Sequence, residues 1–369
     1  MRIVLTGGGT GGHLFPLLAV AEKLQEKLGS EAEFLYIGSG AEIEREIMGK
    51  SGIQTKYILA GKMRRYFSWR NIVDFIKIPL GFIQSLWILI WYMPDAVFSK
   101  GGYVSIPVIF AAWIYRIPIV IHDSDALPGL ANQFLAKFSD LVAVSYPSAE
   151  KYFPANKVSL TGNPERAELV GGDVAAARSF FNFTESKPII LVTGGSQGSQ
   201  VINEAIIKIL PELLSRAQII HQTGANNYER VVHIAGEAGI KAGREGYYPI
   251  KFLDTDIQRN ALAAADLIVS RAGANSIADI AANQKPAILI PLDKSANDHQ
   301  RMNAYEIAKV GGAIVLEETN LGENILLKKI KEILDNEDLR KNMSGKIKAF
   351  YHPQAPEHLA QGLIELVNS

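Results

Sequence analysis

Cysteine is absent from the 369 residues of this chain. Its absence excludes disulfide bonds, thiolate metal ligands and a cysteine nucleophile, and it fits a reducing compartment. Net charge is absent too, because 38 basic residues balance 38 acidic ones. With no surplus of positive charge to attract nucleic acid, no nucleic-acid partner is expected. The apolar run before the first glycines, "MRIVLTGGG", is too short for a signal peptide, so a cytoplasmic protein is expected.

What the sequence does contain is a regular alternation of apolar strands with helix-length segments. This alternation predicts βαβ units with parallel sheets, an α/β fold, and the length suits two domains. The predicted strands are RIVLT, EFLYIG, AVFSK, IPIVIH, LVAVS, PIILVT, AQIIHQT, DLIVS and AILIP. The rhythm breaks between residues 162 and 188. We therefore expect domains at 1–162 and 163–352, with a helical tail at 353–369 that packs back on the first domain.

A glycine-rich turn follows the first strand of each predicted domain. The first is "GGGTGGHLFP" at 7–16 and the second lies in "IILVTGGSQGSQ" at 189–200. The first turn matches G-x-G-x-x-G, but an NAD site needs an acidic residue at the end of the second strand, where 37–39 read Ile-Gly-Ser. Neither turn has the Gly-Lys-Ser/Thr ending of a P-loop. Because a helix start offers free N–H groups and a positive dipole end, the two turns predict two phosphorylated ligands.

Eight motifs in a fixed order make the chain similar to a known family. They are GGGTGGH, GKMRRY, FSKGGYVSIPV, HDSDALPGLAN, GNPER, GGSQGS, SRAGANSIAD and DHQRMNA. In this order they resemble glycosyltransferase family 28 of the GT-B class, whose fold is two Rossmann-like domains with parallel sheets facing an interdomain cleft. The resemblance implies inverting transfer of N-acetylglucosamine from UDP-GlcNAc to the 4-hydroxyl of MurNAc in lipid I. The product is lipid II for peptidoglycan synthesis, and neither a metal nor a cofactor is expected.

In the first domain the resemblance implies an acceptor site. Thr10, Gly11 and Gly12 correspond to the turn near the acceptor diphosphate and the donor sugar. His13 corresponds to the general base, and Asp125 to a contact with the donor sugar. The positive end of the helix dipole favours the neutral imidazole, which can accept a proton. Alternatively, His13 caps the turn or orients the acceptor phosphate, and Asp125 is then the candidate base.

In the second domain the resemblance implies a donor site. Arg166 and Ser196 correspond to groups that hold the nucleotide-sugar and its diphosphate. The backbone of Leu253 corresponds to the group that recognises uracil, and Gln300 corresponds to a contact with the sugar hydroxyls. The nucleotide-binding turn and helix correspond to Ala274, Asn275, Ser276, Ile277, Ala278 and Asp279, with Asp279 on the ribose hydroxyls. Alternatively, Arg166 forms a salt bridge in the linker, and Asp279 is a charge on a helix surface.

Three further polar features are interpreted as structural. His122 ends an apolar strand and is expected to be a buried core histidine, while His299 is expected at a helix start. The chain has two D-x-D sequences, at Asp123 and Asp254. We interpret the first as part of a turn and the second as a helix N-cap, not as metal ligands.

The chain departs from the family pattern at two positions. Most members have Glu-Gln-Asn where this chain has Asp-Ser-Asp at 123–125, and a carboxylate accepts hydrogen bonds where an amide can also donate them. Asp279 is one methylene shorter than the more common glutamate, so the ribose must lie closer or a water must bridge. Neither departure changes the expected class of substrate.

The most hydrophobic segment is "KIPLGFIQSLWILIWYMP" at Lys77–Pro94. It is too short and too interrupted to span a membrane, which takes about 20 apolar residues. The basic residues upstream are Lys62, Arg64, Arg65, Arg70 and Lys77. Basic residues beside exposed Trp, Phe and Leu predict contact of 78–93 with the cytoplasmic membrane surface, where a polyprenyl acceptor lies. The alternative is a buried core helix.

Other functions remain open. A UDP-GlcNAc 2-epimerase would share the fold and the nucleotide half but would need no lipid surface. A glycolipid synthase of related architecture would use a diacylglycerol acceptor. A binding module would bind UDP without transferring sugar.

Overall fold

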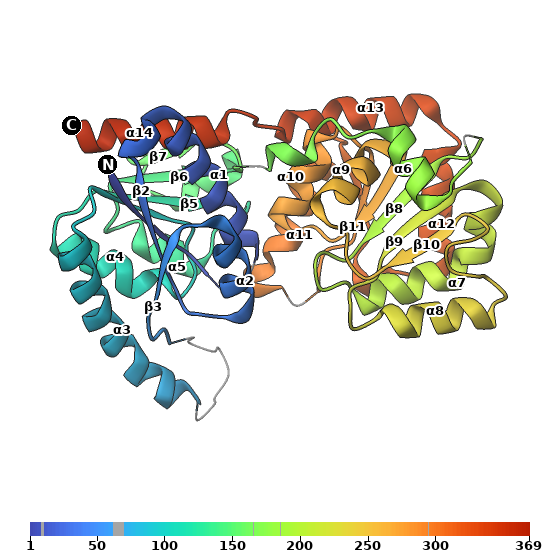
Figure 1. The fold of residues 1–369 in the computed structure, drawn as a ribbon. Coiled ribbons are helices and arrows are strands. Elements are labelled where there is room, and N and C mark those ends of the chain that lie inside the picture. The colour runs from blue at the N-terminus through green and yellow to red at the C-terminus, as the bar shows by residue number, and fades with distance from the viewer. Residues whose placement is uncertain (9–10, 62–69, 165, 185, 294) are drawn as a thin grey trace. The chain divides into compact units, whose positions relative to one another are not determined.

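The computed structural model of the chain describes residues 1–8, 11–61, 70–164, 166–184, 186–293 and 295–369. Its contacts divide the chain into two compact units, which Figure 1 shows as separate groups of helices around a sheet. Unit 1 comprises Met1–Glu165 and His352–Ser369, and unit 2 comprises Arg166–Tyr351. The break therefore falls at the beginning of the 162–188 segment, and the chain returns to unit 1 for its last helix.

Unit 1 is built on a parallel sheet with the strand order β3-β2-β1-β4-β5-β6-β7. The strands are β1 (Arg2–Thr6), β2 (Glu33–Gly38), β3 (Gln54–Tyr57), β4 (Ala96–Ser99), β5 (Ile119–Asp123), β6 (Leu141–Val144) and β7 (Val158–Leu160). The helices are α1 (Gly11–Leu28), α2 (Glu42–Ser51), α3 (Arg70–Tyr92), α4 (Ser105–Ile114), α5 (Leu130–Leu135) and α14 (Ala355–Asn368). Strands β4 and β5 are buried along their whole length, which explains why they read as continuous apolar runs.

The last helix of the chain completes the core of unit 1. In Figure 1, α14 lies beside α1, and the two helices are in contact. Leu359 and Leu363 of α14 are buried in one cluster with Leu14 and Leu17 of α1. An ion pair between Lys27 and Glu357 joins the same two helices.

Unit 2 is built on a second parallel sheet, with the strand order β10-β9-β8-β11-β12-β13. The strands are β8 (Ile189–Thr193), β9 (Gln218–Gln222), β10 (Tyr247–Ile250), β11 (Leu267–Ser270), β12 (Ala287–Leu289) and β13 (Ala313–Val315). The helices are α6 (Val174–Phe181), α7 (Gln200–Arg216), α8 (Tyr228–Glu237), α9 (Thr255–Ala264), α10 (Ala274–Ala282), α11 (His299–Lys309), α12 (Glu323–Leu334) and α13 (Glu337–Ile347). The parallel sheets confirm the predicted α/β fold.

Several helix starts follow from single side chains. Asp254 caps α9 by accepting a hydrogen bond from the N–H of Ile257 at 2.9 Å, as the D-x-D interpretation predicts. Asp173, Ser199 and Asn336 cap α6, α7 and α13 in the same way.

The two sheets share a topology that locates binding sites. In unit 1, β1 lies between β2 and β4, and in unit 2, β8 lies between β9 and β11. From β1 the chain continues to β2, and from β4 it continues to β5, so these two connections run toward opposite edges of the sheet. The connections from β8 to β9 and from β11 to β12 do the same in unit 2. In such sheets the crevice at the carboxyl ends of these two strands is where ligands bind. Both glycine-rich turns begin at such a crevice.

Candidate functional site

Two buried side chains, Tyr36 and Glu44, contact the glycine turn after β1. The hydroxyl of Tyr36 donates a hydrogen bond to the carbonyl of Gly7 at 2.5 Å, and burial raises the pKa of Tyr36, which keeps the phenol protonated. A side chain at Gly8 would collide with the carboxylate of Glu44. That carboxylate in turn accepts hydrogen bonds from Ser39 Oγ and the N–H of Gly40, each at 2.8 Å. The sequence analysis did not identify Glu44 as part of this turn.

The residues that follow begin helix α1. Gly11 and Gly12 form its start, and His13 lies half-buried in its first turn. Thr10 lies outside the described residues. The histidine therefore lies at the positive end of the helix dipole, as the sequence predicts.

The turn after β4 packs against the glycine turn. The N–H of Lys100 donates to the carbonyl of Thr6 at 2.8 Å, and a side chain at Gly7 would lie 3.0 Å from Cβ of Lys100. Gly101 has φ +83°, and a side chain there would collide with the amide of Asn132. Only glycine fits this position without strain.

The end of β5 and the turn after it contain two of the predicted residues. His122 is fully buried, as expected for a core histidine; its ring nitrogens lie 2.6 Å from Lys100 Nζ and 2.9 Å from the carbonyl of Gly162. Burial, reinforced by the charge of Lys100, holds the pKa of His122 well below its usual value. Asp125 is half-buried, and its N–H donates to Asp123 Oδ1 at 3.0 Å.

Asp123 serves this turn as a structural acceptor. Its carboxylate also accepts hydrogen bonds from the N–H of Gly129 at 3.1 Å and from Asn132 Nδ2 at 2.8 Å. Burial, and then the negative charge of Asp125, raise the pKa of Asp123. Among the described residues, no group of three or more His, Asp or Glu is arranged to hold a metal ion.

In unit 2, a buried arginine supports the glycine turn after β8. Ser196 in that turn is exposed, and Ser199 caps helix α7. Arg271, which follows β11, donates to Ser199 Oγ at 2.7 Å and to the carbonyl of Ile290 at 3.1 Å, and it forms an ion pair with Glu318. Arg271 is therefore a functional candidate that sequence reasoning missed, although it lies inside the SRAGANSIAD motif.

Arg166 and Asp279 are brought together by the fold of unit 2. Arg166 Nη2 lies 2.7 Å from Asp279 Oδ2, and both side chains are largely buried. Burial raises the pKa of Asp279, while the positive charge of Arg166 opposes that rise. The salt bridge considered for Arg166 thus exists, and its partner is the residue expected at the ribose. Asp279 is not a surface charge.

The other predicted donor residues lie on three elements of unit 2. Ala274, Asn275 and Ser276 are half-buried in the first turn of α10, and Ile277 and Ala278 are buried behind them. Leu253 is buried between β10 and α9. Gln300 is half-buried in the first turn of α11, where its Oε1 accepts from the N–H of Leu292 at 3.1 Å, and His299 begins that helix as expected.

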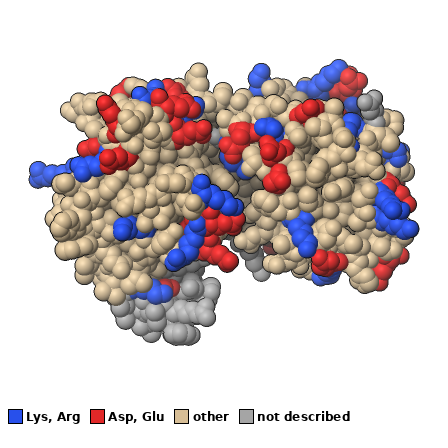
Figure 2. Space-filling model, in the orientation of Figure 1, with Lys and Arg blue, Asp and Glu red and all other residues tan. Residues whose placement is uncertain are grey.

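Helix α3 in unit 1 presents an apolar face to solvent. Trp87 and Trp91 are 66% and 70% exposed, so the buried-helix alternative fails for this face. Leu80, Ile83 and Ile90 are also exposed, and at 100° per residue these five side chains fall within one side of the helix. We call these five residues the α3 face. Figure 2 shows mostly uncharged surface over this part of unit 1.

The basic residues expected beside this face are described in part. Lys62, Arg64 and Arg65 lie outside the described residues. Arg70 begins α3, and Lys77 Nζ lies 3.2 Å from Asp74. In the described parts of the chain, no helix is long and apolar enough to cross a membrane.

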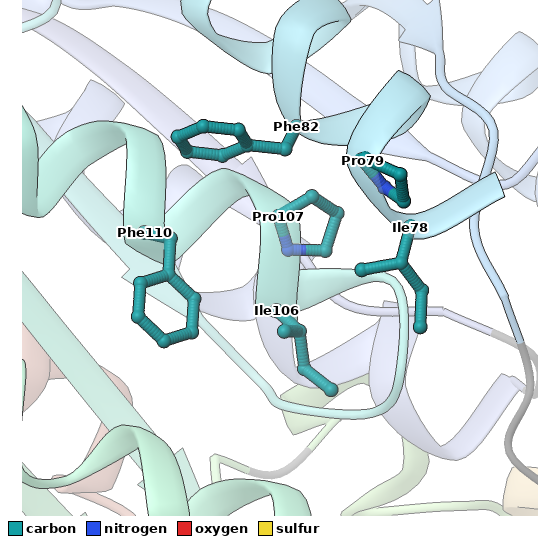
Figure 3. Close-up of a pocket in the computed structure, with 6 residues that line it drawn as sticks. All are labelled: Ile78, Pro79, Phe82, Ile106, Pro107 and Phe110. Carbon is teal, nitrogen blue, oxygen red and sulfur yellow. The ribbon is translucent and has the colours of Figure 1, made fainter. Parts of the chain in front are cut away.

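An apolar cavity of about 420 Å³ lies between α3 and α4. Figure 3 shows its walls, which are Ile78, Pro79 and Phe82 from α3 and Ile106, Pro107 and Phe110 from α4. At 100° per residue, Pro79 falls between the other cavity residues of α3 and the α3 face.

Comparisons with known proteins cover both units. Residues 3–144 match the glycosyltransferase family 28 N-terminal domain, and residues 189–359 match the family's C-terminal domain. The chain is 40% identical over 338 residues to the UDP-N-acetylglucosamine--N-acetylmuramyl-(pentapeptide) pyrophosphoryl-undecaprenol N-acetylglucosamine transferase of Clostridium perfringens, covering 91% of each chain.

Two solved structures have the same fold over nearly the whole chain. The crystal structure of MurG from Acinetobacter baumannii superposes with a TM-score of 0.78 at 25% identity, covering 99% of both chains. The UDP-GlcNAc 2-epimerase of Neisseria meningitidis, bound to UDP-GlcNAc, superposes with a TM-score of 0.71 at 13% identity, covering 99% of this chain and 100% of that one. The second likeness concerns the fold alone.

Proposed function

The chain belongs to glycosyltransferase family 28, and from that premise we propose that it transfers N-acetylglucosamine from UDP-GlcNAc to the 4-hydroxyl of MurNAc in lipid I, forming lipid II. The observation that carries this proposal is the 40% identity to a transferase of that name over 91% of both chains. The family models match residues 3–144 and 189–359, and these two ranges contain both glycine turns. The product belongs to peptidoglycan synthesis.

We propose that unit 2 binds UDP-GlcNAc. The Asp279 carboxylate accepts hydrogen bonds from the ribose hydroxyls, and Arg166, paired with it at 2.7 Å, holds it in place. Ser196 and the start of α7 hold the diphosphate, because a helix start attracts anions. The backbone of Leu253 contacts uracil, and Gln300 contacts the sugar hydroxyls. The start of α10, from Ala274 through Asn275, Ser276, Ile277 and Ala278 to Asp279, completes the donor site.

The departing UDP carries developing negative charge in the transition state. Backbone N–H groups already oriented at a helix start stabilise such charge without reorganisation. Arg271 supports this arrangement indirectly, since its hydrogen bond to Ser199 fixes the residue that caps α7. On this mechanism the chain needs neither a metal nor a cofactor.

We propose that unit 1 binds the acceptor. Thr10, Gly11 and Gly12 lie along the acceptor diphosphate, and His13 removes the proton from the 4-hydroxyl of MurNAc. The half-buried position of His13 in the first turn of α1 supports this role. Asp125 contacts the donor sugar and is the alternative base. An inverting transfer needs such a base on the acceptor side of the reacting carbon.

We further propose that unit 1 rests on the cytoplasmic surface of the membrane through the α3 face. Two exposed tryptophans beside other exposed apolar side chains are typical of an interfacial helix. The cavity between α3 and α4 gives the same region room for a hydrocarbon chain. Peripheral attachment suits an acceptor whose lipid does not leave the bilayer.

The proposed activity is tested by incubating the purified protein with radiolabelled UDP-GlcNAc and lipid I in anionic vesicles. Label should move to the lipid fraction, and omission of lipid I should abolish the transfer. Conversion of UDP-GlcNAc to its 2-epimer without acceptor would instead indicate the epimerase whose fold is similar. Labelling of diacylglycerol vesicles without lipid I would indicate a glycolipid synthase, and UDP binding without either reaction would indicate a binding module.

A further inference from the structure

A buried lysine lies at the crevice of unit 1, and the proposed mechanism does not use it. Lys100 directly follows β4, and its side chain and backbone together are 3% exposed. Its ammonium lies 2.6 Å from Nδ1 of His122 and is hydrogen-bonded to Ser124 Oγ. A lysine is almost never this buried unless its charge is compensated.

The direction of each hydrogen bond in this cluster follows from chemistry. The carbonyl of Gly162 can only accept, so His122 Nε2, at 2.9 Å, carries the ring proton. Nδ1 of the same neutral ring then accepts from Lys100. Ser124 accepts from Lys100 as well and donates its own proton to Asn163 Oδ1. Each of these four hydrogen bonds therefore has one donor and one acceptor, and Lys100 donates two of them.

This chain of hydrogen bonds joins three separate turns. Lys100 belongs to the turn after β4, and Gly162 and Asn163 belong to the turn after β7. His122 lies at the end of β5, and Ser124 lies in the turn that follows it. The ammonium is the group through which the first turn is connected to the other two. Asp125, the residue proposed to contact the sugar, directly follows Ser124.

We propose that Lys100 is a positioning residue for the transfer, which fixes the Ser124–Asp125 turn through its hydrogen bonds and supplies the positive charge that balances the Asp123 and Asp125 carboxylates. This inference rests on the proposed function, because it gives Asp125 a role at the substrate. Lys100 itself does not touch the reacting atoms in this proposal. It acts through Asp125.

The electrostatics of the cluster support this role. The charged partners of Lys100 are Asp123 and Asp125, and the titratable group facing it is the neutral His122. The turn after β7 contributes the uncharged Gly162 and Asn163 to this cluster. Burial lowers the pKa of Lys100 to about 8, although both carboxylates oppose the shift. The lysine therefore carries its charge at neutral pH and loses it as the pH rises above about 8.

The test compares Lys100→Met and Lys100→Gln with the unaltered protein in the lipid I transfer assay between about pH 5.5 and 9. Neither variant carries the buried ammonium. Because a hydrogen bond to a charged group contributes a factor of about 10 to 100, we expect kcat/KM of both variants to fall by about that factor below pH 8, where Lys100 of the unaltered protein is charged. Above about pH 8, where Lys100 of the unaltered protein is itself losing its charge, the profiles should converge.

Two controls separate positioning from a general structural effect. Lys157→Met removes a partly buried lysine of the same unit that donates to the carbonyl of Ser139, and it should leave the profile unchanged. In an Asp125→Asn background, Lys100→Met should cause no further pH-dependent loss, because the carboxylate through which Lys100 acts is already absent. Calorimetry with UDP and thermal melts verify that each variant is folded.

The outcomes are distinct. A loss of activity equal at all pH values, or one that persists in the Asp125→Asn background, would mean that Lys100 merely stabilises the fold. Profiles identical to that of the unaltered protein for both variants would also overturn the inference. If the unaltered protein fails to glycosylate lipid I, the proposed function fails instead. If the methionine variant does not fold, the glutamine variant, which keeps hydrogen-bond donors, decides the matter.

Discussion

The guanidinium of Arg166 and the carboxylate of Asp279 lie 2.7 Å apart in unit 2, although 113 residues separate them in the sequence. Arg166 is the first residue of the unit, and Asp279 lies on α10. Their pairing fixes the orientation of the Asp279 carboxylate. A flexible, exposed aspartate would lack such a fixed orientation. The donor site proposed here depends on this orientation.

Replacing Asp279 with alanine is expected to weaken UDP binding. Hydrogen bonds to a charged group are worth about 1.5–3 kcal/mol, so the affinity measured by calorimetry should fall about 10- to 100-fold. Asp256→Ala is the matched control, because Asp256 is an exposed aspartate of the same unit that pairs with Arg259. Undiminished UDP affinity in a folded Asp279→Ala protein would rule out the ribose assignment.

Replacing Trp87 and Trp91 with serine is expected to weaken binding to anionic vesicles. Burial of one large apolar side chain is worth about 1.5–3 kcal/mol, so each change should reduce vesicle binding about 10- to 100-fold in sedimentation experiments. Because both rings are largely exposed, the melting temperature and UDP affinity should stay close to those of the unaltered protein. Ile325→Ser removes an exposed apolar side chain of unit 2 and should leave vesicle binding intact. Loss of folding on replacing the tryptophans would instead mean that the two side chains stabilise unit 1.

Replacing His13 with alanine is expected to slow turnover by roughly 10²- to 10⁴-fold, the usual contribution of a general base. Donor affinity should change little, and the acidic limb of the pH–rate profile should disappear. If His13 merely positions the acceptor diphosphate, His13→Asn, which keeps a hydrogen-bond donor, should restore most of the rate. An asparagine variant near full speed with its acidic limb intact would transfer the base role to Asp125.

Stability should fall as the pH drops below about 6.5, in part because of His221. This residue of β9 is buried, with its ring nitrogens 2.9 Å from the Tyr247 hydroxyl and 3.0 Å from Asn203 Oδ1, and burial lowers its pKa to about 3. Below the ordinary histidine pKa the unfolded chain binds a proton that the folded chain does not bind. The folded state therefore loses stability relative to the unfolded state as the pH falls from about 6.5 toward 3.

The contribution of His221 can be isolated by comparison with His221→Gln. Between pH 7 and 5, the free energy of unfolding should fall about 2 kcal/mol more steeply in the unaltered protein than in the variant. Urea titrations at several pH values measure this difference. His122, whose pKa is also lowered, contributes equally to both proteins. Parallel pH dependences would show that His221 is protonated in the folded state.

The sequence predicted the interior of both sheets and missed their edges. All nine predicted strands are present, and the four that were not predicted, β3, β7, β10 and β13, are the outermost strands of the two sheets. A central strand is buried on both faces and is mostly apolar, which makes it recognisable. An edge strand such as β3, "QTKY", has no buried residue, so its composition resembles that of a loop.

For the candidate site, too, part of the structure could be predicted from the sequence and part could not. Glycine turns, the start of α11 and the cap at Asp254 depend on neighbours in the sequence, and local patterns indicate them. Glu44, Lys100 and Arg271 act through partners far along the chain, such as Gly8, His122 and Glu318. A single sequence carries no record of such pairing. The lysine after "AVFS" was the one available hint, since a charge directly after a buried strand is unusual.

Because α14 packs on unit 1, it affects the order in which the two units can fold during synthesis on the ribosome. The nascent chain exposes residues 1–165 first, but Leu14 and Leu17 lack the cover of Leu359 and Leu363 until the last helix has been synthesised. Unit 2 is continuous in sequence, from Arg166 to Tyr351. Although its synthesis begins later, it can complete its core before unit 1, which needs residues 352–369. This apolar surface of α1 is therefore left open to chaperones until α14 has been synthesised.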